Sequence, residues 1–388
     1  MARLEVWLRE LFGPEGEARG ADSFDVLGEA IRRVAAAHAR SQTRPFRDSI
    51  LDEAQGRRLI ASLSKSALNI ADRCDAAMPK MLRRSRREVS AFRRRLARTW
   101  GLGLDRLDAL YDAQMEIGSH FLESERRGES RPGPKLVALS RVHVRSCRVV
   151  AEICWLLRGG FADGAHARWR TLHELAVVAL LLAQNDDELA TRYLDHRAIQ
   201  VLANARQLER HAEALNWEAP TEAEMATMVA ERNRLVNLYG PAFESQYGWA
   251  AALLSKYRPT FADVEERARL AKWRPIFGWA SHGVHGGAQG FVALGAIEDR
   301  SHLLLAGVSN RGLLEPAQNT IIAMEHLTAA LMLAQPTAEN LVLVTGFIEL
   351  ATRCRDAFVE AHDVVEARTA ALRTESKTDT SVPPHESA

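Results

Sequence analysis

Residues 160–184 are GFADGAHARWRTLHELAVVALLLAQ, a polar and charged stretch that passes directly into a solid apolar block. The block, residues 175–183, would be apolar on every side of a helix, so we expect it to lie inside a bundle, surrounded by other helices. It is too short to span a bilayer, which needs roughly 20 residues. Charged side chains just before such a helix must be paired or must face a cavity, because a buried unpaired charge is costly.

A second segment, residues 136–157, also lacks a wide polar stripe and is expected beside the first at the centre of the fold. Almost all the rest of the chain has helical periodicity, interrupted by glycine and proline. The sequence therefore predicts an all-α, multi-helix bundle with two central apolar helices. The expected helices are 50–78, 79–99, 104–126, 135–158, 162–184, 187–215, 221–239, 261–290, 315–334 and 337–370.

Two segments depart from this pattern. Residues 291–308 form two short apolar runs around a polar turn, which predicts a small β-hairpin. Residues 371–388 are polar and aperiodic, which predicts a disordered tail. The Pro/Gly-rich segment ERRGESRPGPK indicates a boundary, so we expect an N-terminal helical region over 1–130 and a helical core domain over 131–370.

Composition excludes several classes of protein. The 388 residues are 47% hydrophobic, and 51 basic residues balance 50 acidic ones, so no global charge favours nucleic acid or an anionic membrane. The N-terminus has no apolar signal segment, and no membrane-spanning run occurs, so we expect a cytoplasmic protein. The excess of arginine over lysine is typical of a GC-rich bacterial genome. The four cysteines are too far apart for a CxxC metal site.

Arg168 and His173 have the spacing of the R-x4-6-H motif of the HEPN ribonucleases. In that motif the arginine stabilises phosphate charge and the histidine transfers a proton. The spacing occurs three times in this chain, so it is only slightly more frequent than chance predicts. Positions five apart also lie about 140° apart around a helix, which favours a structural His173 in the core or at its rim.

Arg170 and Glu174 are four residues apart on the same predicted helix, as are Ser281 and His285 on a later one. A pair such as Arg170 and Glu174 ties helices together more often than it acts in catalysis. Around Ser281 and His285, the glycines at 283, 286 and 287 indicate either close helix packing or close approach of the backbone to a ligand. His282 lies beside His285 on the second helix, but two histidines do not make a zinc site, and no Glu-x-x-His motif for a di-iron centre occurs. The sequence therefore predicts neither a metal nor a cofactor.

Residues 82–98 form a basic amphipathic helix with eight arginines and one glutamate. These arginines would neutralise several phosphates and bind RNA or DNA in a salt-sensitive manner. Alternatively, they form a solvated face that is balanced by acidic residues elsewhere. The arginines are Arg83, Arg84, Arg86, Arg87, Arg93, Arg94, Arg95 and Arg98.

The order of features between residues 135 and 335 resembles a bacterial family, the domain of unknown function 5677 family. Its pattern has a Gly-rich turn, an Arg-x3-Glu, an Arg-Tyr element and a Ser-x3-His. These fall on Gly159/Gly160, Arg170/Glu174, Arg192/Tyr193 and Ser281/His285. The resemblance covers roughly half of the chain and implies a helical fold with an unassigned activity. It favours Arg170, Glu174 and His285 as one polar cluster.

The sequence thus favours a binding or interaction module that contains a buried polar cluster of arginine, glutamate and histidine. The alternative is a HEPN-like, metal-independent ribonuclease or another nucleic-acid-acting effector in a defence or stress system. A protein partner or a homodimer is compatible with both, and a membrane is not expected. The cluster is predicted to comprise Arg170, Glu174, Arg192, Tyr193, Ser281, His282 and His285, with catalytic candidates Arg170, Glu174 and His285, followed by Arg168 and His173.

Overall fold

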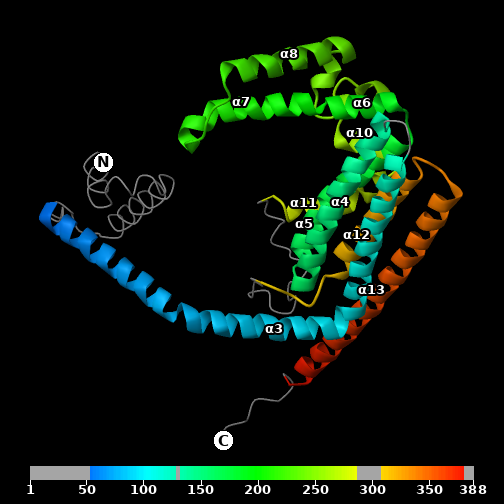
Figure 1. Cartoon of the computed structure of the whole chain (residues 1–388). Helices are drawn as coiled ribbons and strands as arrows, with labels where there is room; N and C mark the ends of the chain where they lie inside the picture. The colour runs from blue at the N-terminus through cyan, green and yellow to red at the C-terminus, as the bar shows by residue number, and fades with distance from the viewer. Residues whose placement is uncertain (1–52, 128–131, 286–306, 380–388) are drawn as a thin grey trace, which may run out of the picture. The chain divides into compact units, whose positions relative to one another are not determined.

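The computed structural model describes residues 53–127, 132–285 and 307–379 (Figure 1). The chain divides into two compact units, Met1–Ser85 and Arg86–Ala388. The hydrophobic core and the candidate site both lie in the second unit. The division into the sequence domains 1–130 and 131–370 remains a prediction.

The described residues form an all-α protein, as predicted, and contain no β-strand. No helix among them is both long enough and apolar enough to cross a membrane. The α-helices are α3 (Glu53–Arg127), α4 (Pro134–Gly159), α5 (Ala162–Ala183), α6 (Asp187–Asp195), α7 (Arg197–Leu215), α8 (Glu222–Tyr239), α9 (Ala251–Leu254), α10 (Phe261–Arg267), α11 (Arg274–His282), α12 (Leu314–Met332) and α13 (Ala338–Asp379). Short 3-10 helices are η1 (Pro241–Glu244), η2 (Gly248–Ala250) and η3 (Ala271–Trp273).

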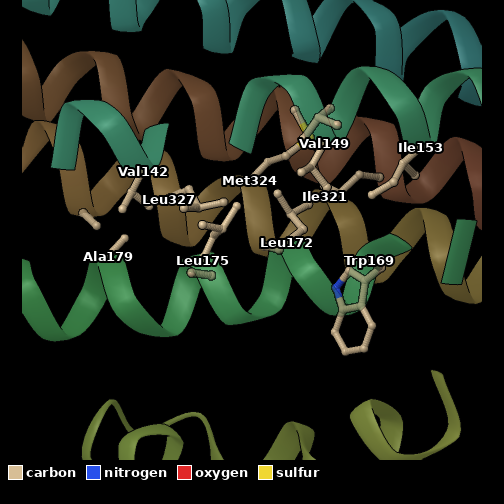
Figure 2. Packing of buried hydrophobic residues seen from close by; sticks show 14 of the residues in the cluster. Val142, Val149, Ile153, Trp169, Leu172, Leu175, Ala179, Ile321, Met324 and Leu327 are labelled. Atoms are coloured by element: carbon tan, nitrogen blue, oxygen red, sulfur yellow. The ribbon is translucent and has the colours of Figure 1, made fainter. Parts of the chain in front are cut away.

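Helix α5 lies in the middle of the bundle, in contact with α4, α12, α10 and α11. Its buried side chains Leu172 and Leu175 point toward α4 and α12, where Val149 and Ile321 belong to the same hydrophobic cluster (Figure 2). Apolar burial contributes roughly 25 cal/mol per Å², so this central layer supplies much of the stability. Helix α4 is buried toward α5 and α12 but exposes one narrow face to solvent.

The turn between α4 and α5 is short because Gly160 adopts a left-handed conformation, with φ of 78°. Its N–H caps the helix by donating to the carbonyl of Leu157. A Cβ at this position would lie 2.8 Å from the backbone oxygen of Ser309 and 2.6 Å from the ring of Phe92. The glycine therefore allows both the turn and the close approach of neighbouring segments.

Several predicted helix boundaries were wrong. The three helices expected between residues 50 and 126 form the single helix α3, with Pro79 inside it rather than in a first turn. Side chains such as Trp100 and Leu104 are buried on either side of Gly101 and Gly103, so packing holds the helix together across these weak helix formers. Conversely, the expected helix 187–215 is divided at His196.

The expected helix 261–290 is also divided, into α10, η3 and α11. Helix α13 continues to Asp379, so the first part of the tail predicted to be disordered is helical. Residues 380–388 lie outside the described part of the chain. The same is true of residues 286–306, which contain most of the predicted hairpin, so the hairpin stays a prediction.

Candidate functional site

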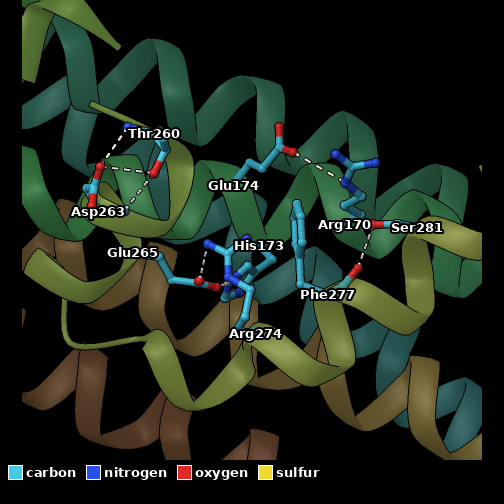
Figure 3. A network of polar contacts seen from close by, with 9 residues as sticks. All are labelled: Arg170, His173, Glu174, Thr260, Asp263, Glu265, Arg274, Phe277 and Ser281. Carbon is cyan, nitrogen blue, oxygen red and sulfur yellow. Dashed lines mark hydrogen bonds and ion pairs between the residues drawn. The ribbon is translucent and has the colours of Figure 1, made fainter. Parts of the chain in front are cut away.

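Arg170 and Glu174 lie where α5 meets α11. The Arg170 Nε atom is 3.6 Å from Glu174 Oε1, and both side chains are partly buried. Arg170 Nη1 also lies 3.3 Å from His285 Nε2, at the end of this described segment. Ser281 does not join these contacts, because its hydroxyl donates to the carbonyl of Phe277 within α11 at 2.7 Å (Figure 3). The structure therefore places Arg170, Glu174 and His285 together, and Ser281 beside them.

An aromatic ring separates two charged pairs at this junction. The guanidinium of Arg170 lies 4.5 Å from the ring centroid of Phe277, and that of Arg274 lies 5.3 Å from it. Both distances are in the range of cation–π attraction. Burial raises the pKa of Glu174, and the positive charge of Arg170 opposes that shift. Burial also raises the pKa of the nearby Tyr247 to about 12, so this phenol is a neutral donor at ordinary pH.

The best-buried polar contact in this region joins His173 of α5 to Glu265 of α10. His173 Nε2 and Glu265 Oε1 are 2.7 Å apart, and the side chains are only 3% and 1% exposed. Arg274 of α11 forms an ion pair with the other oxygen of Glu265 (Figure 3). His173 is therefore a satisfied core histidine, which ties the short helices α10 and α11 to the central helix. We call these three residues the buried triad.

Sequence reasoning missed Glu265 and Arg274. His173 and Glu265 are separated by 92 positions, and no sequence motif links the two. Their pairing depends on how α10 packs against α5. A glutamate inside a short helix carries no sequence signal that distinguishes it from exposed neighbours such as Glu266.

The structure does not bring Arg168 and His173 together in a contact. Arg168 instead forms an ion pair with Glu152 of α4, and its Nη1 donates to Thr171 Oγ1 at 3.2 Å. His173 is buried on the side of α5 that meets α10. This arrangement is the one expected for positions about 140° apart on a helix.

The remaining predicted cluster residues contact other partners. Arg192 of α6 lies 3.8 Å from Glu188 and stacks over the Tyr239 ring at 4.6 Å. Tyr193 packs edge-on against Trp249. His282 is half-buried at the last residue of α11. The predicted cluster thus consists of a part at α5 and α11, and of a separate set of contacts around α6.

A groove of about 440 Å³ lies between the exposed face of α4 and α5. Sequence reasoning did not select it, although the spacing of Arg141, Arg145 and Arg148 places them on one helical face. In the described part of the chain, no three histidine, cysteine or acidic side chains are grouped as a metal site would need. The groove is lined by Ser140, Arg141, Val144, Arg145, Arg148, Val149, Glu152 and Arg168.

The region that holds the groove and the polar cluster is also the region of family resemblance. Residues 136–301 match the model of DUF5677, a family of unknown function. The match confirms the predicted resemblance. It extends from α4 past α11 and leaves α3, α12 and α13 outside. No curated protein and no solved structure matches this chain.

The segment that matches the family model, residues 136–301, contains neutral buried histidines that make stability depend on pH. Burial lowers the pKa of both His143 and His166 to about 4. The unfolded chain would take up these protons near pH 6.5, so acidification below that value favours unfolding. This contribution to stability is complete above pH 6.5 and decreases as the pH falls toward 4.

We therefore expect the urea midpoint to fall between pH 7.5 and pH 5. His166, which stacks on Trp169, has an unpartnered Nε2, so replacing it by phenylalanine should make the fall smaller. Chemical denaturation of both proteins at the two pH values measures this difference. An equal fall of the urea midpoint in the wild type and in the phenylalanine variant would show that His166 does not contribute to the pH dependence of stability.

The basic segment of α3 is exposed. All eight arginines of this segment are exposed to solvent: Arg83, Arg84, Arg86, Arg87, Arg93, Arg94, Arg95 and Arg98. The guanidinium of Arg95 lies 6.0 Å from the Phe92 ring centroid. Exposure agrees equally with a solvated face and with a contact surface, so the binding of RNA or DNA here remains a prediction.

Proposed function

We propose that this protein is a binding module for phosphate-rich anions, and that the groove between α4 and α5 is its binding surface. The observation that carries the proposal is the lining of the groove, in which four arginines face a single carboxylate. Guanidinium groups present several N–H donors in a planar fork that matches phosphate oxygens.

The positive charge of the groove is compensated only in part by its own lining. Glu152 already forms an ion pair with Arg168. Arg141, Arg145 and Arg148 are exposed and make no hydrogen bond or ion pair within the described residues. The lining therefore has three arginines whose donors are free to bind an anion, although Arg145 does lower the pKa of Glu174 through its charge.

The groove is also held rigidly. Val149 lines it and is 1% exposed, because the opposite faces of α4 and α5 pack into the central core. The arginines therefore project from a helix whose position is already fixed, which reduces the entropy lost on binding. The buried triad fixes α10 and α11 to the other side of α5. We assign it a supporting role, together with the pair Arg170–Glu174.

The test is isothermal titration of the full chain with sodium tripolyphosphate at 50 and 200 mM NaCl. We expect the affinity for tripolyphosphate to decrease as the salt concentration rises. It should also decrease by about 10-fold or more when Arg141, Arg145 and Arg148 are all changed to glutamine, because each position then loses its charge-assisted hydrogen bonds. Glutamine has nearly the helix propensity of arginine, so α4 should stay intact.

A matched control removes the same charge elsewhere. Arg197, Arg206 and Arg210 are exposed on α7, and their triple change to glutamine should leave the affinity within about 2-fold. A third variant, with Arg93, Arg94 and Arg95 changed to serine, tests the basic segment of α3 separately. Lack of binding by the wild type at 50 mM NaCl, or equal affinity of the α4 and α7 variants, would reject the proposal.

A further inference from the structure

We infer that the anion bound in this groove is a single-stranded nucleic acid, which contacts the arginines through its phosphates and Trp155 through a base. The inference rests on the proposed function and adds the class of ligand. It starts from the exposed face of α4, where Trp155 continues the stripe formed by Arg141, Arg145 and Arg148.

These four residues share one face of the helix. With 100° per residue, all of them fall within about 40° of a common direction. The rise of 1.5 Å per residue places Arg141 and Arg148 about 10 Å apart along the axis, and Trp155 about 10 Å further on. The positive charges are therefore distributed along a line, which suits a chain of phosphates better than one compact anion.

The exposure of Trp155 is the second observation that supports a single-stranded nucleic acid as the ligand. Its side chain is 71% exposed, although a tryptophan gains more than most residues from burial. A basic groove with an aromatic side chain in line is the combination that binds single strands, because each base offers a face for stacking. Glu152 lies between Arg148 and Trp155, but its ion pair with Arg168 offsets its repulsion of a phosphate.

The aromatic residue also discriminates between classes of polyanion. An acidic peptide would satisfy the arginines and would leave Trp155 without a planar partner. In a duplex, the bases stack on one another and their faces are not available. A single strand satisfies both parts of the surface at once.

Two labelled ligands separate the contribution of the phosphates from that of base stacking. They are 5′-fluorescein-labelled dT12 and a labelled abasic 12-mer that has the same phosphates and no bases. By fluorescence anisotropy, the affinity of the wild type for dT12 should be at least about 5-fold higher than its affinity for the abasic strand. This ratio corresponds to the lower end of the stacking energy of one base on an aromatic side chain. Three phosphate contacts on a single strand predict a slope of about −2 for log K against log salt concentration.

Changing Trp155 to alanine should lower the affinity for dT12 to that for the abasic strand, and should leave the abasic strand unaffected. Trp217 is 66% exposed just after α7, and its change to alanine is the matched control, with no expected effect. Circular dichroism and thermal melting confirm that each variant is folded, and the more conservative Trp155→Phe should retain part of the preference for dT12.

The outcomes distinguish this inference from the proposed function. If both strands bind equally and Trp155→Ala has no effect, the inference is overturned while the anion-binding proposal stands. Displacement of dT12 by poly-glutamate at equal charge overturns the inference in the same way. If neither strand binds while tripolyphosphate does, the inference alone is overturned. If the triple glutamine variant of α4 binds tripolyphosphate and both strands like the wild type, both proposals fail.

Discussion

Changing Glu265 to alanine is expected to lower the free energy of unfolding by about 3–5 kcal/mol, the usual cost of removing one partner from a buried ion pair. Glu265 is 1% exposed and accepts from His173 on one oxygen while it pairs with Arg274 through the other. Its loss leaves the 3%-exposed His173 side chain without its hydrogen-bond partner. Arg274, at 38% exposure, can turn to solvent, so most of the cost falls on the histidine.

Urea unfolding followed by circular dichroism measures this change. The control is Glu266→Ala, because Glu266 is the next residue of α10 and is exposed. Its substitution should shift stability by no more than about 0.5 kcal/mol. In the double variant His173→Ala/Glu265→Ala, the loss should be smaller than the sum of the single losses. Equal, small losses for Glu265→Ala and Glu266→Ala would show that the buried triad does not stabilise the fold.

Changing Trp169 to alanine should destabilise the protein to a similar degree, by about 3–5 kcal/mol. The indole is 1% exposed, and its ring lies against the rings of His166 and His173 on the same helix, α5. Its Nε1 donates to the carbonyl of Asn319 at 2.9 Å. Truncation would therefore leave a cavity and an acceptor without its donor.

Trp155→Ala is the matched control for this substitution as well. The two tryptophans are on neighbouring helices, but Trp155 is exposed and should change stability by no more than about 0.5 kcal/mol. Thermal melting and denaturant unfolding of the two variants measure the difference. A loss of less than 1 kcal/mol for Trp169→Ala would mean that the centre of the bundle is not where the structure places it.

How much of the fold and of the site could be predicted depended on the range of the interaction. Helices form through hydrogen bonds between residues four apart, so their periodicity is present in any short window of sequence. The apolar block at 175–183 therefore indicated a buried helix, and α5 has this character. The pair Arg170–Glu174 was visible for the same reason, since its partners are four residues apart.

The ends of helices were harder to predict from the sequence, because tertiary packing outweighs the local conformational preference of single residues. Pro79 suggested the start of a helix, yet α3 runs through it. The expected helix over 261–290 is broken, and its pieces α10 and α11 bring Glu265 and Arg274 to the same histidine of α5. A missing hydrogen bond in a helix costs only a few kcal/mol, which long-range contacts can offset.

The sequence by itself determined the helical class, the central position of α5 and the spacing of the arginines on α4. The tertiary structure decided which faces meet. It buried His173 against a carboxylate 92 positions away and left the arginine face of α4 open beside Arg168. Periodicity fixes which residues share a face of one helix, but contacts between distant segments decide whether that face is covered or remains free to bind a ligand.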